Sequence, residues 1–229
     1  MDLYKTDPEF MERFAHFAFD EVVQEAGQQL PEGTRYMAIL ATLLGCQGLA
    51  EFQEVLPRAL DAGVSAVSVK EIVYQAVDYL GIGRVYPFLG AVNQVLESRG
   101  VSLPLEGQAT TTMENRLEKG VETQVAIFGE GMKEAWKAGH INRWLAANCF
   151  GDYYTRRGLT LAQREMITLC FLAAQGGCEP QLTAHAKGNM NLGNDKAFLI
   201  RVVSQCLPYI GYPRSLNAIR CIEEAAGKE

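Results

Sequence analysis

The sequence has little of what nucleic-acid-binding, exported or membrane-spanning proteins require. Its 21 lysines and arginines are outnumbered by 27 acidic residues, and the net charge of −6 leaves no basic surface that could displace counterions from a nucleic acid. The N-terminal residues contain no apolar segment typical of a signal peptide. No run of about 18 uninterrupted apolar residues exists, so the sequence predicts no membrane span. We therefore expect a cytoplasmic protein that acts on neither nucleic acid nor a membrane.

Metal-binding and disulfide motifs are absent as well. The chain has six cysteines, and no two of them have the spacing of the CxxC pair found in zinc sites. In a protein without an export signal, such cysteines are expected to be free thiols rather than disulfides. They are Cys46, Cys149, Cys170, Cys178, Cys206 and Cys221. The sequence thus implies neither a metal nor an organic cofactor.

The alternation of apolar and polar residues that marks a half-buried strand is also missing, and apolar residues recur instead with helical spacing. They form one stripe from Phe10 to Glu25. In residues 34–45 they occupy nearly every face of the predicted helix, as expected for a central buried helix. The expected fold class is therefore all-α. Further helices are predicted at 51–62, 68–80, 85–98, 113–138, 141–156, 161–175, 180–192, 195–210 and 213–225.

Capping residues and helix breakers set the expected boundaries. Ser68, with Glu71 three residues later, matches a capping box at the start of a helix. Pro57 and Pro208 fall inside predicted helices, which we expect them to kink or shorten. Residues 101–112 are polar and rich in breakers, so they are expected to cross the surface as a linker.

The strongest internal pattern is a skeleton of spaced residues that occurs twice. One set recurs at an offset of 130: Gly63 with Gly193, Val73 with Val203, Gln75 with Gln205, Tyr79 with Tyr209, Gly81 with Gly211, and Arg84 with Arg214. Upstream the offset is 129, as for Arg35 with Arg164. Matches with unchanged spacing predict a tandem duplication. Its parts would be a first repeat at 1–100, the linker at 101–112 and a second repeat at 113–229.

Several ordered motifs in the second repeat resemble the carboxymuconolactone decarboxylase family, which also includes the AhpD-like alkylhydroperoxidases. They are FGDYYTRRGL from Phe150 to Leu159, REMITL from Arg164 to Leu169, CEPQLTAH from Cys178 to His185, and a G…YxGxP ending from Gly193 to Pro213. The aromatic-rich first motif resembles the decarboxylase branch more than the hydroperoxidase branch. The resemblance implies an AhpD-like helical bundle assembled as a ring of six units. A duplicated chain would then form a homotrimer with pseudo-sixfold symmetry.

The hydroperoxidases of this family use a C-x-x-C-x-x-x-H motif and a glutamate on the preceding helix. Cys178 and His185 match the first cysteine and the histidine, and Glu165 lies close to the position of the proton-relay glutamate. Gln181 stands where the second cysteine should be. That departure matters because the second thiol closes a disulfide after peroxide has attacked the first.

The spacing of seven residues would place Cys178 and His185 on one helix face, about two turns apart. A neighbouring imidazole or a helix N-terminus would lower the pKa of the thiol. The alternatives are that Cys178 is a small buried apolar residue, that His185 is a hydrogen-bonded core histidine, and that Glu165 is an exposed first-turn carboxylate.

Two arginines and a tyrosine complete the expected substrate-binding set. Either Arg157 or Arg164 could bind a substrate carboxylate through two parallel hydrogen bonds, although such a cluster is usually a solvated surface. Tyr154 could stand at the mouth of the pocket. Because Val55 occupies the position that corresponds to His185, the first repeat is expected to be structural. Tyr79, which recurs as Tyr209, is expected to pack the core.

Three hypotheses on function follow. The first is a carboxymuconolactone decarboxylase-like enzyme that acts on a small anionic lactone or related acid, with His185 as general acid, Glu165 as its orienter and an arginine on the carboxylate. The second is a thiol peroxidase in which Cys178 is attacked by peroxide while His185 and Glu165 relay a proton. The third is an oligomeric binding or scaffold protein without catalytic activity.

Overall fold

The computed structural model describes residues 3–227 as a set of helices, and no strand occurs within that range. The predicted all-α fold class is therefore confirmed. In chain order the elements are α1 (Leu3–Thr6), α2 (Pro8–Ala15), η1 (His16–Glu21), α3 (Val22–Gln24), α4 (Glu32–Gly45), α5 (Leu49–Asp61), α6 (Ala66–Leu80), α7 (Ile82–Ser98), α8 (Arg116–Phe128), η2 (Glu130–Met132), η3 (Ala135–Ala138), α9 (His140–Trp144), η4 (Leu145–Tyr154), α10 (Leu161–Gln175), α11 (Glu179–Asn191) and α12 (Lys196–Ala226).

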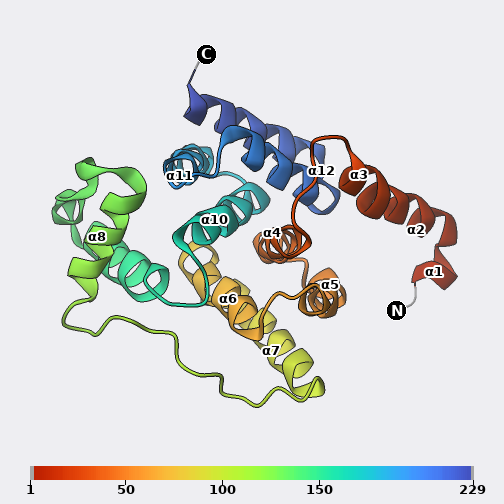
Figure 1. Ribbon diagram of the computed structural model, residues 1–229, viewed down its shortest axis with the longest axis horizontal. Coiled ribbons are helices and arrows are strands. Elements are labelled where there is room, and N and C mark those ends of the chain that lie inside the picture. The colour runs from red at the N-terminus through yellow and green to blue at the C-terminus, as the bar shows by residue number, and fades with distance from the viewer. Residues whose placement is uncertain (1–2, 228–229) are drawn as a thin grey trace.

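Helices α4 and α10 lie at the centre, with α6 and α7 on one side and α11 and α12 on the other (Figure 1). Both central helices are apolar nearly all round, and their side chains are almost completely buried. The two backbones come close together at Gly45. A Cβ atom there would lie 2.7 Å from the Cβ of Ala174, so the contact requires a glycine.

The order and lengths of the helices match between the two halves of the chain. Helices α5 and α11 each have 13 residues, and their first residues are 130 positions apart. Gly81 separates α6 from α7 with φ 79°, and Gly211 breaks α12 at the corresponding place with φ 73°. This correspondence agrees with the predicted repeat, while its origin by duplication stays a prediction.

The halves share one apolar core and exchange hydrogen bonds between equivalent residues. Arg35 donates to Gln205 Oε1 at 2.8 Å, and Arg164 donates to Gln75 Oε1 at 2.9 Å. Each arginine thus contacts the glutamine of the other half. The pattern is a pseudo-twofold arrangement around the α4–α10 contact, and it makes the halves parts of a single folding unit.

Three details of the predicted boundaries are wrong. Ser65, not Ser68, caps α6, because its hydroxyl accepts a hydrogen bond from the Ser68 backbone N–H at 3.0 Å. Glu71 is buried and ion-paired, so it takes no part in a capping box. Although Pro57 is expected to kink or shorten its helix, it does not shorten α5, which matches the length of α11. The predicted helix at 113–138 is in fact α8 followed by two short 3₁₀ turns after Gly129.

The linker region between α7 and α8 contains no helix and runs along one edge of the molecule (Figure 1). None of the helices within residues 3–227 has the length and apolar character that crossing a bilayer would require.

Candidate active site

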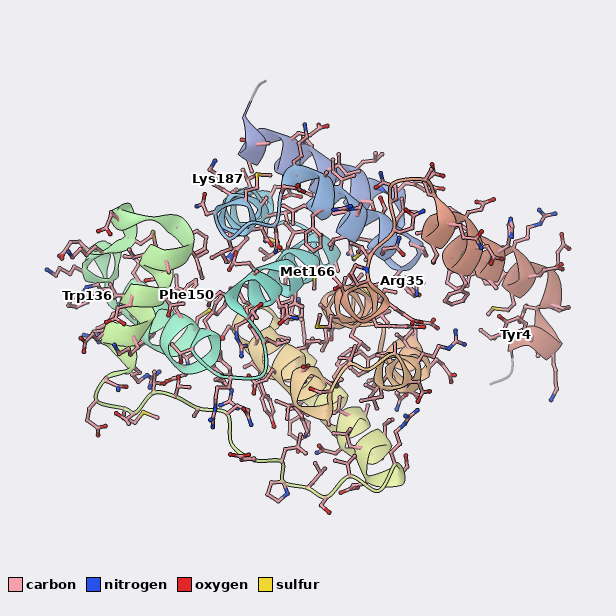
Figure 2. All side chains as sticks on the ribbon, in the orientation of Figure 1. Tyr4, Arg35, Trp136, Phe150, Met166 and Lys187 are labelled. Carbon is pink, nitrogen blue, oxygen red and sulfur yellow. The ribbon has the colours of Figure 1, made fainter. Side chains whose placement is uncertain are left out.

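A pocket of about 740 Å³ lies among α6, α8, η4, α10 and α11. Most of its wall is apolar or aromatic, and a smaller number of polar side chains reach it. Figure 2 shows Phe150 on η4 and Lys187 on α11, two of the elements that flank it. The lining residues are Asp78, Tyr79, Gln124, Phe128, Met132, Leu145, Phe150, Leu172, Gln175, Gly177, Cys178, Gln181, Ala184, His185 and Lys187.

His185 and Glu165 form a hydrogen-bonded pair at this pocket. The distance from His185 Nδ1 to Glu165 Oε2 is 2.8 Å, and Glu165 is completely buried. The prediction that the two residues lie together is correct. A glycine on α11 permits the approach: a Cβ atom at Gly188 would lie 2.8 Å from Glu165 Oε2 and 2.9 Å from the ring of Phe128. A larger residue there would require these side chains of α10 and α8 to shift.

The carboxylate of Glu165 is held from its other side by a tyrosine network. Tyr154 donates a hydrogen bond to Glu165 Oε1 at 2.8 Å, and its hydroxyl lies 2.7 Å from those of Thr168 and Tyr79. Burial raises the pKa of Tyr154 well above its usual value, and the nearby Glu165 charge adds to the effect. Tyr154 therefore stays a neutral donor. The network fixes both oxygens of Glu165, and through them the ring of His185.

The His185 ring is also fixed by packing. The rings of Tyr79 and Phe128 meet it edge-on, with centroids 5.6 and 5.4 Å away. A carboxylate can only accept, so Nδ1 carries the hydrogen of the bond to Glu165. His185 Nε2 makes no hydrogen bond to any of the described residues. It is the ring nitrogen left to exchange a proton with a ligand in the pocket.

Cys178 lines the same pocket but does not contact the His185 ring through a hydrogen bond among residues 3–227. It precedes the first residue of α11, and its Sγ lies 3.4 Å from the Leu172 carbonyl oxygen. Burial raises the pKa of Cys178 above its usual value, and a hydrogen bond from Gln175 offsets this only in part. The pKa of this thiol is thus raised, and not lowered as expected from a helix N-terminus, and burial is the largest cause.

The two arginines predicted to bind substrate do not reach the pocket. Arg164 is fully buried behind it, where its guanidinium pairs with Glu71 at 3.0 Å and donates to Gln75. Arg157 is exposed and donates to the Gly107 carbonyl oxygen at 3.3 Å. Both assignments are therefore corrected. Lys187 is the one lysine or arginine among the residues that line the pocket.

Tyr154 is likewise not at the pocket mouth. It is only 2% exposed and stands behind Glu165, so it positions that carboxylate rather than touching a ligand. The residue that does reach the pocket is Tyr79, which the sequence had indicated as a packing residue. The preceding residue, Asp78, reaches it too. Both belong to the first half of the chain, so the pocket is built by the two halves together and not by the second repeat alone.

Sequence reasoning missed these first-half residues, although one signal was present. The repeated motif conserves tyrosine at 79 and 209, but the residue before it is Asp78 in one copy and Pro208 in the other.

No group of three or more potential metal ligands occurs among the described residues.

Residues 140–224 match the sequence profile of the carboxymuconolactone decarboxylase family. This part of the chain is therefore similar to that family. The matched region contains Glu165, Cys178 and His185, whereas Asp78 and Tyr79 lie outside it. A comparison of the chain with curated proteins finds no significant match.

Proposed function

We propose that this protein is a decarboxylase of the carboxymuconolactone decarboxylase type, acting on a small unsaturated acid, with His185 as the proton donor. The observation that supports this most is the buried His185–Glu165 pair at a largely apolar pocket. A histidine held at Nδ1 by a carboxylate at the wall of a pocket, with Nε2 not bonded to the protein, is suited to general acid–base catalysis.

The reaction requires one proton from the enzyme. Loss of carbon dioxide breaks a carbon–carbon bond and leaves the electron pair on the substrate as a carbanion or enolate. The imidazolium Nε2–H of His185 would protonate that carbon, and Glu165 would stabilise the imidazolium before the transfer. Apolar walls favour the loss of a carboxylate because the product, carbon dioxide, is neutral.

The pocket lining defines a substrate class. Rings such as Phe128 and Phe150 fit a flat, partly apolar molecule, and Lys187 is available for a carboxylate. With Arg157 and Arg164 elsewhere, the carboxylate contact falls to this lysine. We therefore favour a small unsaturated lactone carboxylate over a highly charged acid.

The experiment is an assay of carbon dioxide release from a panel of unsaturated lactone acids, carboxymuconolactone among them. His185→Gln should lower kcat by about 10² to 10⁴-fold, the usual contribution of a general acid. His140→Gln, which replaces an exposed histidine, serves as the matched control. Unchanged turnover in His185→Gln would contradict the proposal.

A thiol peroxidase is the second candidate, because Cys178 and His185 line the same pocket. The raised pKa of Cys178 and the glutamine at position 181 count against it. Two activity measurements on one variant, Cys178→Ser, distinguish the two functions. Sustained peroxide turnover with a dithiol reductant, lost in Cys178→Ser, would favour the peroxidase. Decarboxylation that persists in Cys178→Ser would favour the first proposal.

A further inference from the structure

A second large pocket, of about 520 Å³, lies between the N-terminal helices and α5; we call it the first-half pocket. Its walls come from α1, α2, η1 and α5, and they include the aromatic rings of Tyr4, Phe14 and Phe19. Figure 2 shows Tyr4 on α1, which forms one side of it. The first-half pocket shares no lining residue with the candidate active site, so the two are separate sites.

The repeat identifies the first-half pocket as the counterpart of the candidate active site. Helix α5 corresponds to α11, and this places Glu51 and Glu54 at the positions of Gln181 and Ala184, which line the active-site pocket. The π-helix η1 corresponds to the start of the π-helix η4, because their first residues are 129 positions apart. Each pocket is therefore lined by an α-helix and a π-helix that correspond between the two halves.

The chemistry of the two pockets differs. Val55 occupies the position of His185, so the first-half pocket has no general acid at that position. Glu51 and Glu54 replace a neutral amide and a methyl group. Arg58 is the one cationic group among the residues that line it. Two carboxylates thus accompany a single guanidinium, and the lining has an excess of negative charge when all three groups are ionised.

Glu51 is the carboxylate that most lacks a counter-charge. Its side chain is half-buried, yet its carboxylate makes no hydrogen bond or ion pair to any residue within 3–227. Burial raises the pKa of Glu51; the charge of Arg58 lowers it, and the charge of Glu54 adds to the rise. The Arg58 guanidinium lies over the ring of Phe19, 5.2 Å from its centroid. A cation in the pocket would offset the cost of burying an ionised Glu51.

We propose that the first-half pocket binds a small organic cation, an aryl-alkyl ammonium ion, with its ammonium group at Glu51 and Glu54 and its apolar body against Tyr4, Phe14 and Phe19. An ammonium group has three N–H donors for the carboxylates, and aromatic faces attract a cation. A neutral or anionic molecule of the same size would leave Glu51 without a counter-charge. The site is one of binding rather than catalysis, and it does not depend on the proposed decarboxylase activity.

A methionine in each pocket reports which of the two is occupied. Met11 lines the first-half pocket, and Met132 lines the candidate active site. Their ¹³C-methyl NMR signals are assigned with Met11→Leu and Met132→Leu in methionine-labelled protein. At neutral pH the cation 2-(4-fluorophenyl)ethylamine should shift the Met11 signal in a saturable way and leave the Met132 signal in place. The anion 3-(4-fluorophenyl)propanoate, of similar size, should leave the Met11 signal unchanged.

Two substitutions test the carboxylates. Glu51→Gln should weaken binding of the amine about ten-fold, the usual effect of losing a hydrogen bond to a charged group. Glu54→Gln, at an exposed residue, should weaken it about three-fold. Gln181→Leu, at the position of the other half that corresponds to Glu51, is the matched control and should leave the affinity unchanged. The Tm of Glu51→Gln should equal that of the wild type; if it falls, Glu54→Gln alone decides the comparison.

Three results would overturn the inference. The first is a Met11 signal that does not respond to the amine at millimolar concentration, whether or not the Met132 signal does. The second is binding of the propanoate at the first-half pocket as tight as that of the amine, because apolar contacts alone would then explain it. The third is an unchanged affinity for the amine in the folded glutamine variants, because the carboxylates would then take no part in binding.

Discussion

The hydroxyl of Tyr79 lies 2.7 Å from the hydroxyl of Tyr154, and this contact joins the two halves of the chain directly behind the candidate site. Tyr154 in turn donates a hydrogen bond to Glu165, and Glu165 is hydrogen-bonded to His185. A residue of α6 therefore influences the geometry of a histidine on α11 through three consecutive hydrogen bonds.

The repeat supplies a matched pair of substitutions for this network. Tyr79→Phe removes a hydroxyl that has a buried partner, so it should lower the free energy of unfolding by about 1 kcal/mol and reduce kcat. Tyr209→Phe removes the equivalent hydroxyl, which has no partner among the described residues, and should be neutral or stabilising. Urea unfolding and steady-state kinetics of the two variants give the comparison. Equal losses in both would show that the Tyr79–Tyr154 bond has no special role.

A second prediction concerns the close approach of α11 to the buried glutamate. Gly188→Ala places a methyl group against Glu165, Ile127 and Phe128, at 2.8 to 2.9 Å. The clash should lower the free energy of unfolding by about 1–3 kcal/mol and separate His185 from Glu165. Gly90→Ala is the control, because a Cβ atom there meets nothing within 4 Å and alanine favours the helix. Thermal unfolding of both variants distinguishes a local clash from a general effect of replacing glycine.

The boundaries of a helix could be predicted from the sequence where capping residues and glycines near its ends determine them. The predicted helix at 161–175 coincides with α10, since Thr160 and Gln163 form a capping box and Gly176 ends the helix. The burial of Arg164 could not be predicted, because its partner Glu71 lies 93 positions earlier in the chain. Asp78 was missed for the same reason: only the packing of η4 against α6 brings it to the pocket. Long-range contacts decide such positions, and a single sequence does not contain them.

We also propose that the chain self-associates, as the family resemblance implies. Large apolar side chains are exposed at equivalent positions of the two halves, Ile82 and Tyr86 on α7 and Tyr212 and Leu216 on α12. Light scattering should give a mass about three times that of the 25.2 kDa chain. Tyr86→Lys combined with Leu216→Lys should reduce the mass to a single chain. Met113→Lys, which alters a residue that is 75% exposed elsewhere, should leave the assembly intact.

The last prediction concerns stability against pH and follows from Asp78. Its pKa is raised to about 7 in the folded protein, mainly by burial, whereas an unfolded aspartate titrates near pH 4. Between these values the unfolded chain releases the proton and the folded protein keeps it, so a rise in pH favours unfolding. The cost of ionising Asp78 is thus absent at pH 4 and fully present at pH 8.

Asp78→Asn removes that cost. Because the pKa differs by about three units, the variant should gain about 4 kcal/mol of unfolding free energy over the wild type at pH 8, and much less at pH 4.5. Asp61→Asn is a control with the opposite sign. A hydrogen bond from Arg99 lowers the pKa of Asp61, so the ionised Asp61 stabilises the folded protein at a pH above the pKa of an unfolded aspartate. Asp61→Asn should therefore lose stability at pH 8. Urea unfolding of the three proteins at both pH values measures the differences. A gain for Asp78→Asn that is equal at pH 4.5 and pH 8 would contradict the prediction, because it would mean that Asp78 does not titrate between them.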